Sequence, residues 1–204
     1  MPIASEIEPV ASGISIWRCY DRSVKADLFS TALETTSGTY LIDPIPLAPD
    51  AVADLESAPK IAGIIVTNEN HERAAAQFSE KFTVPIYLSE TLIGTTQLPS
   101  ATAVQDKGFL AVLTAVDIEG APAGEIAIHS ASNDGTMVVG DALINFEPYG
   151  FALLPAKYCS NLKLMRRSLS RLLDYSFERM LFAHGLPILS HARERLEQLL
   201  KEHR

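Results

Sequence analysis

The chain has 204 residues, of which 47% are hydrophobic, and its formal net charge at pH 7 is -8. This length suits one domain, expected to span residues 1–204, with enough apolar side chains for a substantial core. The negative charge argues against binding to nucleic acid, and no apolar run approaches the ~20 residues that a membrane helix needs.

The N-terminus and the cysteines indicate the cellular environment. The first residues have neither the basic start nor the apolar stretch of a secretory signal. Cys19 and Cys159 are far apart and form no CxxC motif, which favours reduced thiols over a disulfide framework. We therefore expect a soluble cytoplasmic protein.

The first 45 residues have the pattern of β-strands joined by short turns. The segments 13–20, 28–36 and 39–42 carry β-branched and aromatic side chains, and the third ends at the turn signal Asp43-Pro44. Strands separated by such short turns are expected to pair in antiparallel fashion.

A parallel pattern follows. The segment 61–66 is a near-continuous apolar run, as expected of a strand that is buried on both faces. It leads into a helix expected over 71–82, for which Asn70 supplies an N-cap. A helix over 50–57 and a strand over 84–88 flank this unit.

The second half repeats the order of strands followed by a strand–helix return. Each half thus predicts one mixed sheet, and the two sheets are expected to pack face to face with helices outside. The predicted fold class is α/β (α+β), a four-layer αββα sandwich. The expected elements are strands over 109–116, 125–129 and 137–139 with a hairpin turn at 133–135, a helix over 161–174, a strand over 180–183 and a last helix capped by Ser190.

Three of the apolar strands end in polar clusters. The strand over 61–66 leads into Thr67-Asn68-Glu69-Asn70-His71-Glu72-Arg73, and two later strands lead into Gly140-Asp141 and His184-Gly185. Ligands of layered α/β proteins bind beyond the carboxyl ends of the strands. The three clusters are therefore expected to form one site.

These clusters resemble the metal-binding motifs of the metallo-β-lactamase superfamily. In that superfamily one strand ends in Thr-His-x-His-x-Asp-His, a strand pair carries Gly-His-Thr-Pro-Gly-Ser, and later strands end in Gly-Asp and His-Gly. Gly140-Asp141 and His184-Gly185 match the last two motifs, and Ile42-Asp43-Pro44 resembles the early Ile-Asp-x-Gly strand end. The resemblance implies the αββα fold and a metal-dependent hydrolase.

The first two motifs depart from the superfamily pattern. The resemblance places Asn68, Asn70 and Ala121 where three histidines hold the first metal. Amide oxygens are weak ligands for zinc, which prefers histidine nitrogen and cysteine sulfur. The first metal site is therefore expected to be lost.

The second metal site keeps more of its ligands. By the resemblance its positions are Glu72, Arg73, Asp141 and His184, and all but the arginine can ligate a metal. Two carboxylates and one imidazole suit a single Zn, Mn or Fe ion with open positions. His71 is a shifted ligand, a general base, or a histidine that bonds only locally. We predict Glu72, Asp141 and His184 as ligands, with His71 and Asp141 as the catalytic residues.

Arg73 supports the opposite interpretation, a site without a cofactor. Its guanidinium is always charged and could pair with Asp141 or Glu72, whose burial without a partner would be costly. Asn68, Asn70 and Arg73 are expected to line the pocket in either case.

The sequence leaves more than one function open. The first is metal-dependent hydrolysis of a small ester-, thioester-, lactone- or phosphoester-like substrate. The alternative is a catalytically inactive binding or partner module in which Arg73 neutralises Asp141 or Glu72. A third uses Glu72 and His71 for metal-free acid–base chemistry. The expected partner is a small molecule rather than nucleic acid or a membrane, and homo-oligomerisation stays open.

Overall fold

The computed structural model describes residues 2–57, 59–104 and 112–203. The strands are β1 (Glu8–Ala11), β2 (Ile14–Asp21), β3 (Ala26–Thr35), β4 (Gly38–Ile42), β5 (Ile61–Ile65), β6 (Ile86–Ser89), β7 (Ala101–Val104), β8 (Thr114–Asp117), β9 (Ile126–Ser130), β10 (Thr136–Val139), β11 (Leu143–Phe146), β12 (Gly150–Leu153) and β13 (Arg179–Phe182). The α-helices are α1 (Pro49–Ser57), α2 (Ala75–Phe82), α3 (Leu162–Ser170) and α4 (Ala192–Glu202), and short 3-10 helices lie at Glu69–His71, Glu90–Leu92, Ala156–Tyr158 and Arg171–Asp174.

The strands form two main sheets. The first has the order β1-β2-β3-β4-β5-β6-β7; its pairs are antiparallel from β1 to β4 and parallel from β4 to β7. The second has the order β13-β10-β9-β8, with β13 parallel to β10. The turn at 133–135 joins the antiparallel strands β9 and β10, as the sequence predicts. A separate hairpin pairs β11 with β12.

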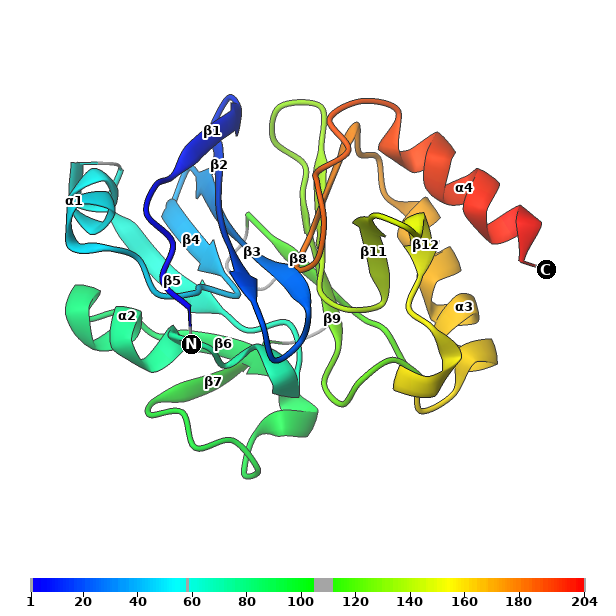
Figure 1. Cartoon of the computed structure of the whole chain (residues 1–204), viewed down its shortest axis with the longest axis horizontal. Coiled ribbons are helices and arrows are strands. Elements are labelled where there is room, and N and C mark those ends of the chain that lie inside the picture. The colour runs from blue at the N-terminus through cyan, green and yellow to red at the C-terminus, as the bar shows by residue number, and fades with distance from the viewer. Residues whose placement is uncertain (1, 58, 105–111, 204) are drawn as a thin grey trace.

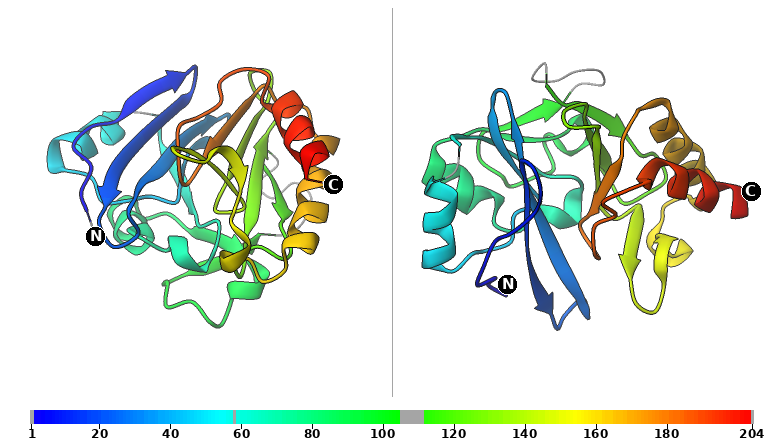
Figure 2. Two further views of the ribbon diagram at one scale, coloured as in Figure 1. Left: turned by 45° about the vertical axis from the view of Figure 1, so that its right-hand side comes forward. Right: turned by 90° about the horizontal axis from the view of Figure 1, so that it is seen from above.

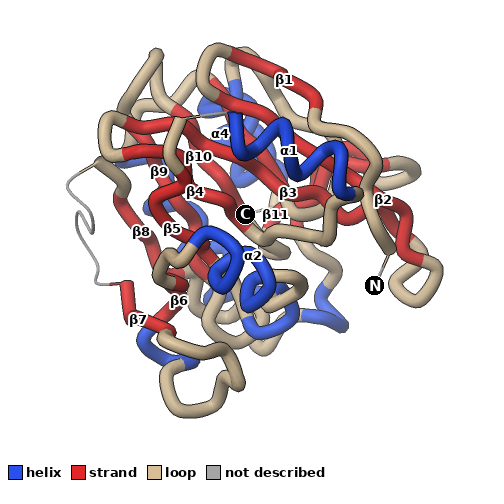
Figure 3. Tube along the Cα trace, turned by 90° about the vertical axis from the view of Figure 1, so that its left-hand side faces the viewer, coloured by secondary structure: helices blue, strands red, loops and turns tan. Residues whose placement is uncertain are grey.

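The two sheets lie between two layers of helices. Helices α1 and α2 cover the outer face of the first sheet, and α3 and α4 cover the outer face of the second (Figure 1). The view from above shows the strands between these helical layers (Figure 2), and the side view shows α1 and α2 in front of the first sheet (Figure 3). The predicted four-layer αββα sandwich is therefore confirmed.

Alternating side chains of the strands supply three apolar layers. In β5, Ile64 packs in the cluster under α1 and α2, whereas the next residue, Ile65, packs between the sheets. In β10, Val138 packs between the sheets and Val139 faces α3 and α4. Because successive strand residues point to opposite faces, a strand that is apolar throughout can serve two layers.

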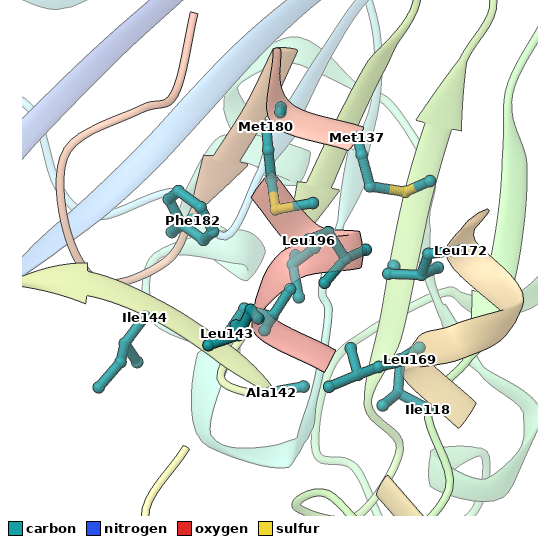
Figure 4. Packing of buried hydrophobic residues seen from close by; sticks show 14 of the residues in the cluster. Ile118, Met137, Ala142, Leu143, Ile144, Leu169, Leu172, Met180, Phe182 and Leu196 are labelled. Atoms are coloured by element: carbon teal, nitrogen blue, oxygen red, sulfur yellow. The ribbon is translucent and has the colours of Figure 1, made fainter. Parts of the chain in front are cut away.

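The layer under α3 and α4 is drawn in Figure 4. Met137 of β10, Met180 of β13 and Leu196 of α4 have no exposed surface and belong to the same cluster. Ala142 and Leu143 extend this cluster to the residues that directly follow Asp141. The segment after β10 is thus held by the core, which fixes the position of Asp141.

Two helix starts differ from the sequence prediction. The helix expected from residue 71 begins at Ala75, because Arg73 has a positive φ of 38°, outside the right-handed helical region. A 3-10 turn precedes it, and the side chain of Asn68, not Asn70, caps that turn by accepting the amide of Asn70. At α4, His191 rather than Ser190 occupies the N-cap position.

Three further features of the structure bear on the sequence predictions. The strand expected over 109–116 falls partly on residues 105–111, outside the described residues, and the described strand β8 is Thr114–Asp117. Cys19 and Cys159 are both free thiols. No helix in the described ranges is long and apolar enough to cross a membrane.

Candidate metal centre

The carboxyl ends of strands from both sheets meet around one cavity. His71 follows β5, Asp141 follows β10 and His184 follows β13, and all three line a cavity of about 990 Å³. Arg73 and Asn70 line the same cavity. The three polar clusters of the sequence therefore form one site.

His71 is buried, and oxygen atoms fix its ring. Its Nδ1 lies 2.9 Å from Asp43 Oδ2 and 2.9 Å from Thr67 Oγ1. Thr67 donates its hydroxyl to Asp43 Oδ2 at 2.5 Å and its backbone amide to Asp43 Oδ1 at 2.8 Å. Because the threonine proton is already engaged, Nδ1–H of His71 donates to Asp43, and the ring presents Nε2 to Asp141 Oδ1 at 3.3 Å.

His184 approaches the same carboxylate oxygen from β13. Its Nε2 lies 3.3 Å from Asp141 Oδ1, and its Nδ1 lies 3.2 Å from the backbone carbonyl oxygen of Asp27. The ligand atoms of His71, Asp141 and His184 all lie within 4.8 Å of one another. In metal sites a histidine ligand typically bonds a carboxylate or carbonyl through its other ring nitrogen. Both histidines have this arrangement, so the three residues fit a metal.

A buried amide–carboxyl pair fixes the other oxygen of Asp141. Asn68 Nδ2 donates to Glu125 Oε2 at 2.7 Å and to Asp141 Oδ2 at 3.2 Å. Glu125 Oε1 accepts the amide of Ala142 at 3.0 Å. A Cβ atom at Gly140 would lie 2.9 Å from both carboxyl oxygens of Glu125, so glycine permits this close approach. The pair leaves Asp141 Oδ1 facing the two histidines.

The charges of the site balance without a metal. Burial and the Arg73 guanidinium lower the pKa of His71, but the carboxylates of Asp141 and Asp43 outweigh them and raise it to about 9. Burial and the nearby Asp141 raise the pKa of Glu125 to about 8. Burial also opposes ionisation of Asp141, but His71 and His184 hold the pKa of its carboxyl well below the usual range. At neutral pH the metal-free site thus contains two positive groups, protonated His71 and Arg73, two carboxylates, Asp43 and Asp141, and a neutral Glu125.

A comparison with protein families shows to which family the chain belongs. The model of the metallo-β-lactamase superfamily matches residues 11–202. The chain belongs to this superfamily. A search of curated proteins found no match.

Solved structures of metallo-β-lactamases have the same fold. The DIM-1 metallo-β-lactamase is 13% identical, with 100% of this chain and 99% of that chain covered and a TM-score of 0.74. The metallo-β-lactamase from Pontibacter korlensis is 16% identical, with 96% and 98% covered and a TM-score of 0.72. FIM-1 from Pseudomonas aeruginosa, solved in its mono-zinc form, is 12% identical, with 99% and 96% covered and a TM-score of 0.69. At such low identity the likeness shows the fold alone.

Within this superfamily fold, Glu72 does not reach the site where the sequence places it as a ligand. Its Oε1 accepts the hydroxyl of Thr96 at 2.6 Å, and it lies outside the group formed by His71, Asp141 and His184. The physical reason is the 3-10 turn before Arg73, which directs His71 inward in its place. The shifted-ligand alternative for His71 matches this arrangement.

Arg73 does not pair with either carboxylate proposed for it. Its Nη1 donates to the backbone carbonyls of Phe29 at 2.6 Å and Asp43 at 2.9 Å, whereas the buried Nη2 has no hydrogen-bond partner in the described part of the chain. In the described ranges Arg73 forms no ion pair with Asp141 or Glu72, and Asp141 pairs with His71 and His184 instead. Arg73 therefore links Phe29, in the first half of β3, to Asp43, which directly follows β4, and holds the backbone of Asp43.

The three residues that the sequence resemblance places at the first-metal histidines differ in burial and contacts. Asn68 is fully buried and bonds Glu125 and Asp141. Asn70 is exposed at the cavity, and Ala121 is a buried part of its wall. Only Asn68 of the three therefore contacts the residues that could hold a metal.

Asp43, Thr67 and Glu125 contact the site but are not among the predicted ligands or catalytic residues. Thr67 belongs to the first polar cluster, and Asp43 also follows an apolar strand, so the strand-end rule that locates Asp141 and His184 applies to both. Glu125 directly precedes the apolar run of β9. A carboxyl group at the start of a buried strand is the one feature of the sequence that indicates a role for it. Its partner Asn68 lies 57 positions away, which sequence spacing does not reveal.

Proposed function

We propose that this protein is a hydrolase that uses one divalent metal held by His71, Asp141 and His184. The observation that supports this most directly is the matching orientation of the two imidazoles. Each has an oxygen acceptor at Nδ1 and presents Nε2 to Asp141 Oδ1 at 3.3 Å. Two histidines and one carboxylate with open positions suit Fe, Mn or Zn.

A metal at this position would supply Lewis acidity, which lowers the pKa of water toward about 7 and polarises a carbonyl or phosphoryl oxygen. The chain's own residues would orient this chemistry. Asp43 holds the tautomer of His71, and Asn68 binds Oδ2 of Asp141, so that Oδ1 faces the two histidines.

The cavity supports a small ester-, thioester-, lactone- or phosphoester-like substrate. Its volume of about 990 Å³ is at the upper end of small-molecule sites, about 300–1,000 Å³. The loss of the superfamily's first-metal histidines supports a site with at most one metal. The FIM-1 relative, whose structure was solved in a mono-zinc form, is a precedent within the fold.

A metal-free binding module is a second candidate, and the charge balance of the site favours it. Protonated His71 lies between Asp43 and Asp141 and, together with the nearby Arg73 guanidinium, can replace the charge of a metal. In this version His71 pairs with both buried carboxylates, and Arg73 supplies the second positive charge without forming an ion pair with any residue that the structure describes. The cavity would then bind a small molecule without converting it.

Metal-dependent turnover separates the two candidates. Protein purified without chelators would be assayed against nitrophenyl esters, a thioester, a lactone and a phosphodiester, before and after removal of metal and after addition of Zn, Mn or Fe. The proposal predicts hydrolysis of at least one class that is lost with the metal, regained on its return and absent in His184→Gln. Turnover that does not depend on metal would contradict the metal-dependent hydrolase and indicate metal-free acid–base chemistry. No turnover of any class with a loaded site would support the binding module.

A further inference from the structure

One wall of the cavity combines aromatic rings with a lysine. Phe146, Tyr149, Lys157 and Tyr158, called the aromatic wall below, all line the cavity. The rings of Phe146 and Tyr149 meet edge to face with centroids 5.7 Å apart. Tyr149 and Tyr158 are 58% and 59% exposed. Large aromatic side chains that stay exposed beside a cavity are typical of a ligand-binding surface.

Lys157 gives this wall its charge. Between residues 144 and 160, all of which the structure describes, it is the only charged residue that lines the cavity. Its Nζ lies 4.6 Å from the centroid of the Tyr158 ring, a cation–π distance. Lys157 forms no ion pair with any described residue, so its charge is free to meet a ligand.

The turn between β2 and β3 also lines the cavity and adds an apolar residue and a second lysine. Val24 is 56% exposed and lines the cavity beside Lys25. Lys25 has a positive φ of 58°, a conformation that favours glycine. The acid beside this turn, Asp21, already accepts hydrogen bonds from the amide and hydroxyl of Ser23.

We propose that the cavity binds a small molecule with an apolar or aromatic body and one anionic oxygen group. The body would lie against the aromatic wall, and the anion would meet Lys157. The net charge of -8 repels anions at long range, so a single negative charge is favoured over several. The proposed ligand class deepens the proposed function and rests on it in one respect. If the protein is a hydrolase, the bound molecule is its substrate, an ester-like compound that carries a carboxylate or phosphate.

Two fluorescent probes test the binding without any turnover. Anilinonaphthalene sulfonate and N-phenylnaphthylamine share the same aromatic body, but only the first has an anionic group. Both would be titrated into metal-free protein, so the result does not depend on hydrolysis. We expect both to bind, the sulfonate more weakly at high salt because screening weakens its contact with Lys157.

Matched variants locate the site. Lys157→Gln should weaken the sulfonate about fivefold, the upper end for an exposed ion pair, and leave the neutral probe unchanged. Tyr158→Ala should weaken both probes. Lys163→Gln, an exposed lysine on α3 that does not line this cavity, should change neither.

Three results would overturn the proposal. The first is that neither probe binds. The second is an unchanged affinity for the sulfonate in Lys157→Gln, and the third is an equal loss of sulfonate affinity in Lys157→Gln and Lys163→Gln. Hydrolysis of neutral esters combined with any of these would leave the proposed function standing and reject only the anionic substrate. Conversely, probe binding as expected in a protein without turnover would reject the hydrolase and keep the ligand class.

Discussion

His71 links the site to pH, because it is protonated in the folded, metal-free protein. Its pKa is raised from 6.5 to about 9 in the fold, so its contribution to stability is complete below pH 6.5 and is lost as pH rises to 9. This loss is on the order of 3 kcal/mol. Glu125 acts in the same direction, because its pKa is raised from 4.5 to about 8 and the fold therefore loses stability as pH rises through that interval.

We therefore predict that the free energy of unfolding of the metal-free protein, prepared with a chelator, falls between pH 6.5 and pH 9. Urea unfolding at both pH values measures this. The fall should be smaller in His71→Gln, which cannot carry the proton. A free energy of unfolding that rises or stays constant over this interval would show that His71 is neutral in the fold.

Asn68 is the residue through which Glu125 orients Asp141. In Asn68→Ala, both Glu125 Oε2 and Asp141 Oδ2 lose their donor, which should cost about 1–3 kcal/mol of stability. Metal affinity should fall by about 10- to 100-fold, the usual effect of losing a residue that orients a ligand. Calorimetric metal titration measures the affinity. The neighbouring Asn70→Ala is the control, since Asn70 is exposed, and an equal loss in both variants would contradict this role.

At the scale of elements, α3 anchors the turn that forms part of the cavity wall. Its N-cap residue Asn161 accepts the amide of Leu164 at 3.0 Å and donates its own amide to the carbonyl of Gly120 at 2.9 Å. Gly120 has a φ of +87°, and a Cβ there would lie 2.3 Å from the carbonyl oxygen of Asn161. The turn that carries Ala121 and Pro122 to the cavity therefore depends on the start of α3.

Asn161→Ala should lower the free energy of unfolding by about 1 kcal/mol, because the cap is lost. Asn161→Asp should retain most of the stability, since aspartate is an equally good cap. Chemical unfolding of the two variants beside the native chain measures the difference. Equal stability of Asn161→Ala and the native chain would show that water replaces the cap at no cost.

For the whole molecule, the layered fold is predictable from the sequence, but the site is predictable only in part. Apolar strands and amphipathic helices in the right order predict the sandwich, and Asp141 and His184 follow directly from strand ends. The exchange of His71 for Glu72 depends on the left-handed backbone of Arg73, and arginine is not a residue type that signals this conformation. The contact of Asn68 with Glu125 depends on packing between two sheets, which local patterns do not encode.

The central claim is that His71, and not Glu72, completes a one-metal site with Asp141 and His184. Metal content of the native chain, His71→Gln and Glu72→Gln, purified in parallel without chelators and measured by elemental mass spectrometry, tests it most directly. We predict close to one metal per chain in the native protein and in Glu72→Gln, whose side chain contacts Thr96 instead, and almost none in His71→Gln. Metal retained by His71→Gln but lost from Glu72→Gln, or absent from all three proteins, would contradict the claim.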